Sequence, residues 1–320
     1  MMSLPLIFFH QGFEPYLAFT LWQARRTNPR SPIYLLGDNF NDLTSLGITH
    51  RHFGDFSKEA RDFVSVYYHL SGHELACERL CFERWFYLMA FLRETQIEEF
   101  CFLDSDYFLL MDLAEGSARW RGCDIAGAPA WAFAYFKSPR VVEQFCTFVM
   151  ERYRDENQIR EWMKPVPGQI TTREGTQWIS DMCLWLMFFK QLGIAHLDLR
   201  SPHDGIVFDG SLEAAEGFQM RDGYKKLTIR EKAVFGGLES TGQSVQFAGL
   251  HLLGKFPKRL GPLFTGFPIE LLRACSRPRL FRNWWKLAQM WSYCRQYRKQ
   301  SFLGDVRWQK YPMTDLAPGG

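Results

Sequence analysis

Two short apolar runs separated by one helical segment open the chain and restrict its fold class. Leu4–Phe9 and Ile33–Leu36 have the length and composition of buried strands, and apolar residues recur at helical spacing between Pro15 and Arg26. Turn-forming residues end both runs, and the breaks between the elements are short. This order predicts a βαβ unit, and therefore an α/β fold with a mixed, mostly parallel sheet flanked by helices.

Further elements follow along the chain. Helical spacing predicts helices at residues 55–70, 74–93, 141–153 and 180–191, the last with Ser180 as its N-terminal cap. Apolar runs predict strands at residues 100–103, 107–110, 124–131, 132–136, 194–199 and 245–250. Residues 155–176 are polar and contain two prolines and two glycines, which predicts a loop, and residues 201–247 show little periodicity.

Charge divides the chain into two parts. The 320 residues carry 38 Lys and Arg against 35 Asp and Glu, a net charge of +3, which argues against a dedicated nucleic-acid-binding protein. From Arg273 onward, however, 10 basic residues accompany only 2 acidic ones, so residues 1–272 are acidic. We expect residues 1–272 to form one α/β domain and residues 273–320 a basic, Trp-rich helical appendage.

The appendage has aromatic residues on one face at helical spacing, among them Phe281, Trp284, Trp285 and Trp291. Three interpretations fit this pattern. The helix docks on the acidic domain, it contacts an anionic membrane surface, or it binds single-stranded nucleic acid through stacked rings. We favour docking, rank the membrane second, and expect no nucleic-acid partner.

The N-terminus lacks the features of a secretory signal, because MMSLPLIFFHQGF has no basic segment and its apolar run is short. The longest apolar run, MCLWLMFF, falls well short of the ~18–20 residues that span a membrane. Eight cysteines without a C-x-x-C pair are expected to be buried free thiols in a reducing compartment. These features predict a cytoplasmic protein, with peripheral contact at the inner face of a membrane left open.

The segment CFLDSDYFLL holds the first candidate for a chemical site. Asp104 and Asp106 flank Ser105 directly after a buried strand, so we expect them at the carboxyl edge of the sheet, where α/β proteins bind ligands. Two carboxylates suit a hard divalent ion that takes its other ligands from water and phosphate. A solvated turn is the alternative, but turn carboxylates seldom lie between two apolar runs.

A second candidate lies in the segment GLHLLGKF. His251, at the end of the last predicted strand, can supply a third ligand to a borderline divalent ion such as Mn²⁺, unless it is simply a core histidine. Gly254 permits close backbone approach, and Lys255 and Lys258 can neutralise a diphosphate. The segment also matches G-x-x-x-x-G-K, but Phe follows where a P-loop needs Ser or Thr, and the chain has no G-x-G-x-x-G.

Two charged residues on predicted helices complete the inner site. Asp181 begins a helix, where an acidic residue ordinarily stabilises the helix dipole. It can also face a sugar or acceptor hydroxyl as a general base or orienting group. Arg84 lies among apolar neighbours in CFERWFYLMAFL, so its guanidinium is expected either to pair with a phosphate or carboxylate or to extend to the surface.

Polar residues also follow the first two predicted strands. His10, Gln11 and Gly12 come after the first strand, and Asp38 and Asn39 after the second. In a parallel sheet both groups lie on the ligand-binding edge, where they can contact a nucleotide base and ribose. Ordinary turn chemistry is the alternative explanation.

The order of these pieces carries a family resemblance. A strand with a polar turn precedes an Arg-bearing helix, and then come strand–DSD–strand, the segment GAPAWAFAYFKSP, SDM at a helix start, and a late H-x-x-G-K. The array spans residue 4 to about residue 260 and resembles the glycosyltransferases of the GT-A fold, which use nucleotide-sugar donors. In the glycogenin-like branch the late motif is H-x-x-G-x-x-K, whereas Pro257 stands at that Lys position here and Lys258 follows.

The resemblance implies roles for the candidate residues. Asp106 and His251 would hold Mn²⁺ or Mg²⁺, and Asp104 would bind the same ion or the ribose. Residues 125–137, with Ala128, Pro129 and Trp131, would line the acceptor side. A nucleotide sugar, expected to be UDP-linked, would contact His10, Gln11, Gly12, Asp38, Asn39, Arg84, Ser105, Gly254, Lys255 and Lys258.

The resemblance also implies an activity. The chain would be a metal-dependent glycosyltransferase acting on an acceptor hydroxyl of a glycan or lipid-linked saccharide. The late His motif favours retention of configuration over inversion, and Asp181 is the candidate catalytic residue. The alternative is a non-catalytic protein of the same fold that uses its basic tail to hold a membrane or polymer.

Overall fold

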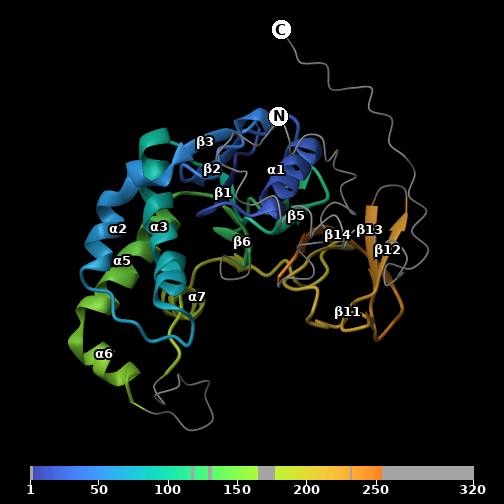
Figure 1. Cartoon of the computed structure of the whole chain (residues 1–320). Coiled ribbons are helices and arrows are strands. Elements are labelled where there is room, and N and C mark those ends of the chain that lie inside the picture. Colours follow the sequence, from blue (N-terminus) through green and yellow to red (C-terminus); the bar gives the residue numbers. More distant parts are fainter. Residues whose placement is uncertain (1–2, 117–118, 129–131, 165–176, 231–232, 254–320) are drawn as a thin grey trace.

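The computed structural model describes residues 3–116, 119–128, 132–164, 177–230 and 233–253. Its central sheet has the strand order β3-β2-β1-β4-β7-β6-β8, and Figure 1 labels β1, β2, β3 and β6 of this sheet. These strands are β1 (Leu6–Phe9), β2 (Ile33–Gly37), β3 (Thr49–His52), β4 (Phe100–Asp104), β6 (Ile125–Ala128), β7 (Phe133–Phe136) and β8 (His196–Leu197). Among them only β7 runs antiparallel to its neighbours. The predicted mixed, mostly parallel sheet is therefore confirmed.

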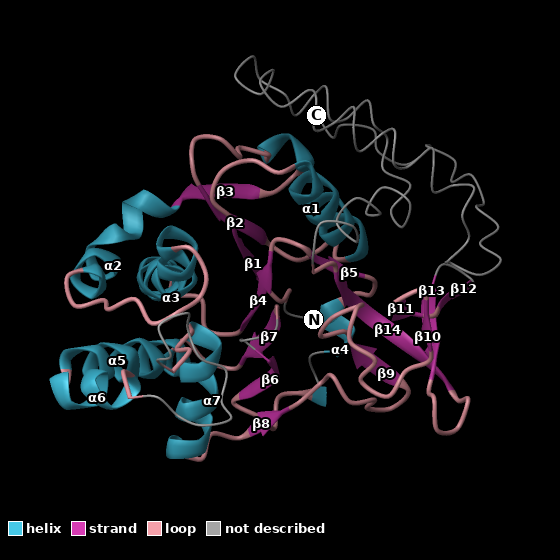
Figure 2. Cartoon of the chain, turned by 60° about the horizontal axis from the view of Figure 1, so that its bottom comes forward, coloured by secondary structure: helices cyan, strands magenta, loops and turns pink. Residues whose placement is uncertain are grey.

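Helices cover both faces of this sheet. Figure 2 shows α1 on one side of it and α2, α3, α5 and α7 on the other. The α-helices are α1 (Pro15–Thr27), α2 (Ser57–Val64), α3 (Leu75–Thr95), α4 (Leu113–Gly116), α5 (Arg140–Arg154), α6 (Glu156–Trp162) and α7 (Asp181–Leu192), and short 3₁₀ helices lie at Thr44–Leu46 and Phe53–Phe56. As predicted, Ser180 caps α7, because its hydroxyl accepts the Cys183 N–H at 3.3 Å.

Two hydrophobic clusters lie on the two faces of the sheet. In β1, Leu6 and Phe8 belong to the cluster beneath α1, whereas Ile7 and Phe9 belong to the cluster beneath α2, α3, α5 and α7. Successive strand residues point to opposite faces, and all four are buried. This double burial explains why the strand reads as a continuous apolar run in the sequence.

A second sheet lies beside the first. It consists of β5 (Tyr107–Leu109), β9 (Ile206–Phe208), β12 (Leu227–Arg230), β13 (Ala233–Gly237) and β14 (Ser244–His251), accompanied by the ribbon of β10 (Met220–Arg221) and β11 (Tyr224–Lys225). β14 pairs antiparallel with β5 and β13. Because β4 and β5 belong to different sheets, the turn between them, Asp104–Asp106, lies where the two sheets meet.

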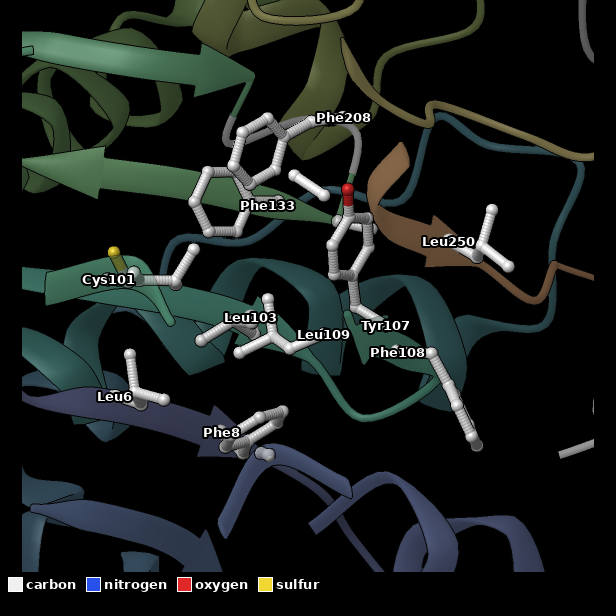
Figure 3. Packing of buried hydrophobic residues seen from close by; sticks show 14 of the residues in the cluster. Leu6, Phe8, Cys101, Leu103, Tyr107, Phe108, Leu109, Phe133, Phe208 and Leu250 are labelled. Carbon is white, nitrogen blue, oxygen red and sulfur yellow. The ribbon is translucent and has the colours of Figure 1, made fainter. Parts of the chain in front are cut away.

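An aromatic stack joins the two sheets. The Tyr107 ring of β5 stacks on Phe133 of β7 at 5.6 Å, and Phe133 stacks on Phe208 of β9 at 4.4 Å between centroids. Figure 3 shows these rings together with Leu250 of β14. Apolar packing therefore continues from the central sheet into the second sheet and holds β5 and β14 against the end of β4.

The structure differs from the sequence predictions in several segments. Residues 156–162, predicted to be loop, form α6, whose cap is the Asp155 carboxylate accepting the Asn157 and Gln158 N–H groups. β3 was not predicted, and of the strand predicted at residues 194–199 only β8 forms. Residues 201–247 contain β9 to β13, which are two to five residues long, too short to show a period in sequence.

The described residues test the predictions on cysteine burial and membrane spans, but not the prediction on the C-terminal appendage. Cys101 and Cys146 are buried as expected, but Cys77 is exposed, so that prediction was wrong for it. Among the described helices, none is both long enough and apolar enough to cross a membrane. The appendage at residues 273–320 lies outside the described residues, so the division into two parts stays a prediction.

Gly249 of β14 offers a test of how the second sheet is held. A Cβ added there would collide with Cε1 of Tyr107, whereas one added at exposed Gly122 would meet nothing within 4 Å. We expect Gly249→Ala to lower the free energy of unfolding by about 1–3 kcal/mol through overpacking, and Gly122→Ala to leave it within about 1 kcal/mol. Urea denaturation of both variants measures this; equal stability would contradict the close β14–Tyr107 packing.

Candidate metal and donor site

Two elements far apart in the sequence bring the predicted metal ligands together. Asp104 ends β4 and Asp106 lies in the turn before β5, while the antiparallel register of β5 and β14 places His251 opposite Tyr107. The Leu252 N–H also donates to the Asp106 carbonyl at 3.1 Å. One ligand atom from each of Asp104, Asp106 and His251 lies within 4.8 Å of the others, so the three can contact one ion.

The His251 ring is oriented for such a role. Its Nδ1 lies 2.7 Å from the Gly210 carbonyl oxygen, which can only accept, so Nδ1 carries a proton and donates it. The other nitrogen, Nε2, lies 3.5 Å from Oδ1 of Asp106. Two carboxylates and one imidazole nitrogen with this tautomer fit a borderline divalent cation such as Mn²⁺.

Burial and charge oppose each other at this cluster. Burial alone would lower the pKa of His251, but the hydrogen bond that its ring donates to Asp106 and the charges of Asp106 and Asp104 outweigh burial and raise that pKa to about 9. Burial raises the pKa of Asp104, the charge of Asp106 adds to this, and Arg84 acts in the opposite direction. An imidazolium is therefore the counter-ion of the two carboxylates at neutral pH when no metal ion is bound.

Arg84 of α3 lies between two carboxylates. Its Nη1 donates to Oδ1 of Asp104 at 2.6 Å, and its Nη2 donates to Oδ2 of Asp181 at 2.8 Å. Nε1 of Trp85 also donates to Oδ2 of Asp181, at 3.0 Å. Burial would lower the pKa of Arg84, but Asp104 and Asp181 raise it above its ordinary value. Among the partners predicted for Arg84, the structure shows carboxylates, and they tie α3 and α7 to the end of β4.

The residues after β1 and β2 form a connected edge beside this cluster. Nδ1 of His10 lies 2.8 Å from Oγ of Ser105, which connects the first loop to the Asp104–Asp106 turn. The Asp38 carboxylate accepts the Gly12 N–H at 2.7 Å, so the two predicted loops meet. Gly12 has a φ of 77°, which favours glycine at this position.

Other predicted residues at this edge have fewer described contacts. Gln11 and Asn39 are exposed, and Ala128 pairs through its backbone with Phe133 in the β6–β7 ladder. The predictions for Pro129, Trp131, Gly254, Lys255 and Lys258 lie outside the described residues and stay predictions.

Sequence reasoning missed several polar residues around the site. Asn41 is buried, and its Nδ2 donates to the carbonyls of His10 and Gly12 at 2.8 and 2.9 Å. Asp209 and Lys225, which lie behind His251, form a buried ion pair. The only sequence signal for Asn41 was its place in the turn sequence DNFND, and Asp209 and Lys225 lie in a segment without periodicity.

Comparisons with known proteins concern the fold. No protein-family model and no curated protein sequence matches the chain. Similar solved structures include apo mouse xyloside xylosyltransferase 1, with 8% identity, 62% of this chain and 85% of that chain covered, and a TM-score of 0.44. The bifunctional glycosyltransferase WbbM has 11% identity, 65% and 40% coverage and a TM-score of 0.40. GlyE of Streptococcus pneumoniae TIGR4 has 14% identity, 62% and 45% coverage and a TM-score of 0.33.

The descriptions of these three proteins name a xylosyltransferase and two glycosyltransferases. The chain spans less than half the length of the WbbM and GlyE chains. With identities below 25% and TM-scores below 0.5, the likeness is one of overall shape, and a function must rest on the residues of the site.

The raised pKa of His251 predicts a pH dependence of metal binding. Because this pKa lies near 9, above the ordinary 6.5, Mn²⁺ must displace a proton at neutral pH. We expect Mn²⁺ affinity to rise about tenfold per pH unit from pH 7 toward 9 and then to level off. Calorimetric titration of the wild type and of His251→Asn, which lacks the titrating group, measures this. Wild-type affinity that stays constant over that range would contradict the cluster as described.

Proposed function

We propose that the chain is a metal-dependent glycosyltransferase of the GT-A type. It would transfer a sugar from a nucleotide-diphosphate donor, expected to be UDP-linked, to a hydroxyl of a glycan or lipid-linked saccharide. The observation that carries the proposal is the convergence of Asp104, Asp106 and His251 within 4.8 Å at the carboxyl end of a parallel strand. The sheet edge beside them, formed by the loops after β1 and β2, is where α/β folds bind nucleotides.

The ligand set supports a site for a bound cation. Asp104, Asp106 and His251 would hold Mn²⁺ or Mg²⁺, which supplies positive charge against a diphosphate leaving group. The carboxylates of this acidic domain could not receive a diphosphate alone, because like charges would repel. The pKa of His251 is raised to about 9, so binding of the ion would displace the Nε2 proton and make that nitrogen available as a ligand.

The remaining residues would orient the donor. The contacts of Ser105 with His10 and of Asp38 with Gly12 hold three loops of this edge together, which leaves exposed Gln11 and Asn39 accessible to a base or ribose. Arg84 keeps the Asp104 carboxylate in one position by hydrogen bonding. Arg84 and Trp85 both donate to Oδ2 of Asp181. These contacts support a role for Asp181 in orienting Arg84, which in turn binds Asp104.

The central experiment is a transfer and hydrolysis assay with a panel of nucleotide sugars in the presence of Mn²⁺. Asp106→Asn keeps the size of the side chain but removes its charge, so we expect activity to fall by about 10²-fold or more. Asp222→Asn, at an exposed carboxylate in the β10–β11 turn, is the matched control and should keep full activity. Activity equal in Asp106→Asn and wild type, or absent from wild type with every donor, would contradict the proposal.

Arg84 provides a second prediction. Lysine has one ammonium group and cannot span Asp104 and Asp181 as the planar guanidinium does. Misplacing the Asp104 carboxylate by about 1 Å is expected to reduce kcat of Arg84→Lys by about 10²-fold. Arg79→Lys changes an arginine on the same helix that pairs with Glu83 away from the site, and it should retain activity. Equal kcat values for the two variants would contradict the role of Arg84 in positioning the Asp104 carboxylate.

A further inference from the structure

A buried ion pair lies behind the metal cluster. The side chains of Lys225 and Asp209 are 1% and 0% exposed, and Nζ of Lys225 lies 2.5 Å from Oδ1 of Asp209. Nζ also contacts the Ser211 carbonyl at 3.0 Å and Oε2 of Glu216 at 2.5 Å. Such pairs are seldom the best way to stabilise a fold, because apolar residues of similar volume often do as well or better. A buried pair at this location therefore calls for another role.

The contacts of Asp209 and Gly210 point to His251. Oδ2 of Asp209 accepts the backbone N–H of His251 at 3.1 Å, and the Gly210 carbonyl accepts Nδ1–H of its ring at 2.7 Å. Residues 209–210 therefore bind both the main chain and the imidazole of His251, the predicted metal ligand. The ring contact also sets the tautomer that leaves Nε2 toward Asp106.

Lys225 fixes this segment from both sides. It binds the carboxylate of Asp209, before Gly210, and the carbonyl of Ser211, after it. Between the end of β9 at Phe208 and the start of β10 at Met220, the described chain has no regular helix or strand, so ladder hydrogen bonds do not hold Gly210 in place. The backbone of Lys225 is anchored in turn, since its N–H donates to the Leu212 carbonyl at 2.9 Å.

We propose that Lys225 and Asp209 are positioning residues for His251. Lys225 holds the segment 209–211 in the one position from which Asp209 and Gly210 bind the histidine. Neither residue belongs to the three predicted metal ligands. The inference rests on the proposed function, because it assumes that His251 binds a metal ion. Outer partners of metal ligands typically change metal affinity by about 10- to 100-fold.

The test uses the full chain and Mn²⁺ itself. The double variant Asp209→Leu/Lys225→Met removes both charges together, so it leaves no unpaired ion between these two residues. We expect its Mn²⁺ affinity, measured from the electron paramagnetic resonance signal of free Mn²⁺, to fall about 10- to 100-fold. The nitrogen coupling of bound Mn²⁺, which reports the imidazole ligand, should weaken toward that of His251→Ala. A purely structural role would not move this coupling.

Two further variants make the outcome decisive. Glu216→Gln keeps an acceptor for Lys225 and leaves the contacts of Asp209 and Gly210 with His251 in place, so it should bind Mn²⁺ within about twofold of wild type. Asp209→Asn retains Glu216 as counter-ion for Lys225, and it replaces the double variant in the test if that variant does not fold. We expect the Mn²⁺ affinity of Asp209→Asn to fall about tenfold.

The results separate this inference from the proposed function. If the double variant, or Asp209→Asn in its place, folds and keeps wild-type Mn²⁺ affinity and wild-type nitrogen coupling, the positioning role is overturned while the metal site stands. A wild-type protein that binds no Mn²⁺ contradicts the metal site, and the positioning role fails with it. Loss of affinity and coupling in the double variant, with both retained in Glu216→Gln, supports the inference.

Discussion

The pairing of β14 with β5 is the interaction on which the site depends. It joins residues about 140 positions apart in the sequence and places His251 opposite Tyr107, next to Asp106. Because β5 directly follows the Asp104–Asp106 turn, any shift of the β5–β14 register by one residue would point the histidine to the opposite face of the sheet. The aromatic stack of Tyr107, Phe133 and Phe208 holds this second sheet against the first.

Charge balance is the second constraint. Three carboxylates, those of Asp104, Asp106 and Asp181, gather at one end of the central sheet, and the described positive groups among them are Arg84 and the protonated His251. Arg84 stays charged at all working pH values, whereas the proton on His251 can be exchanged for a metal ion. Under the proposed function, a metal ion would take the place of this proton and offset the charge of a diphosphate leaving group.

Elements set by local pattern could be predicted from the sequence, and contacts between distant segments could not. β1, α1 and β2 were predicted within a few residues because both faces of the strands are buried and the helix starts at a proline. Asp104 and Asp106 stood out because carboxylates interrupt an apolar run. The short strands between Ile206 and Gly237 gain their stability from neighbours in the sheet, so no period marks them.

The residues that contact the predicted ligands could not be predicted from the sequence for the same reason. His251 was a candidate from its motif, but its partners Asp209 and Gly210 come from a segment without periodicity, and Lys225 looks like any surface lysine in sequence. The cap at Asp155 marks the start of α6, yet the many polar residues that follow led to a loop prediction. Only the tertiary structure shows which polar side chains are buried.

A crystal soaked in MnCl₂ and measured at the manganese absorption edge tests the central claim most directly. If Asp104, Asp106 and His251 form a metal site, an anomalous difference peak will lie between their side chains, within coordination distance of Nε2 of His251 and of both carboxylates. A peak that lies elsewhere, or no peak there at saturating Mn²⁺ and pH near 9, would contradict the metal site and the transferase function built on it.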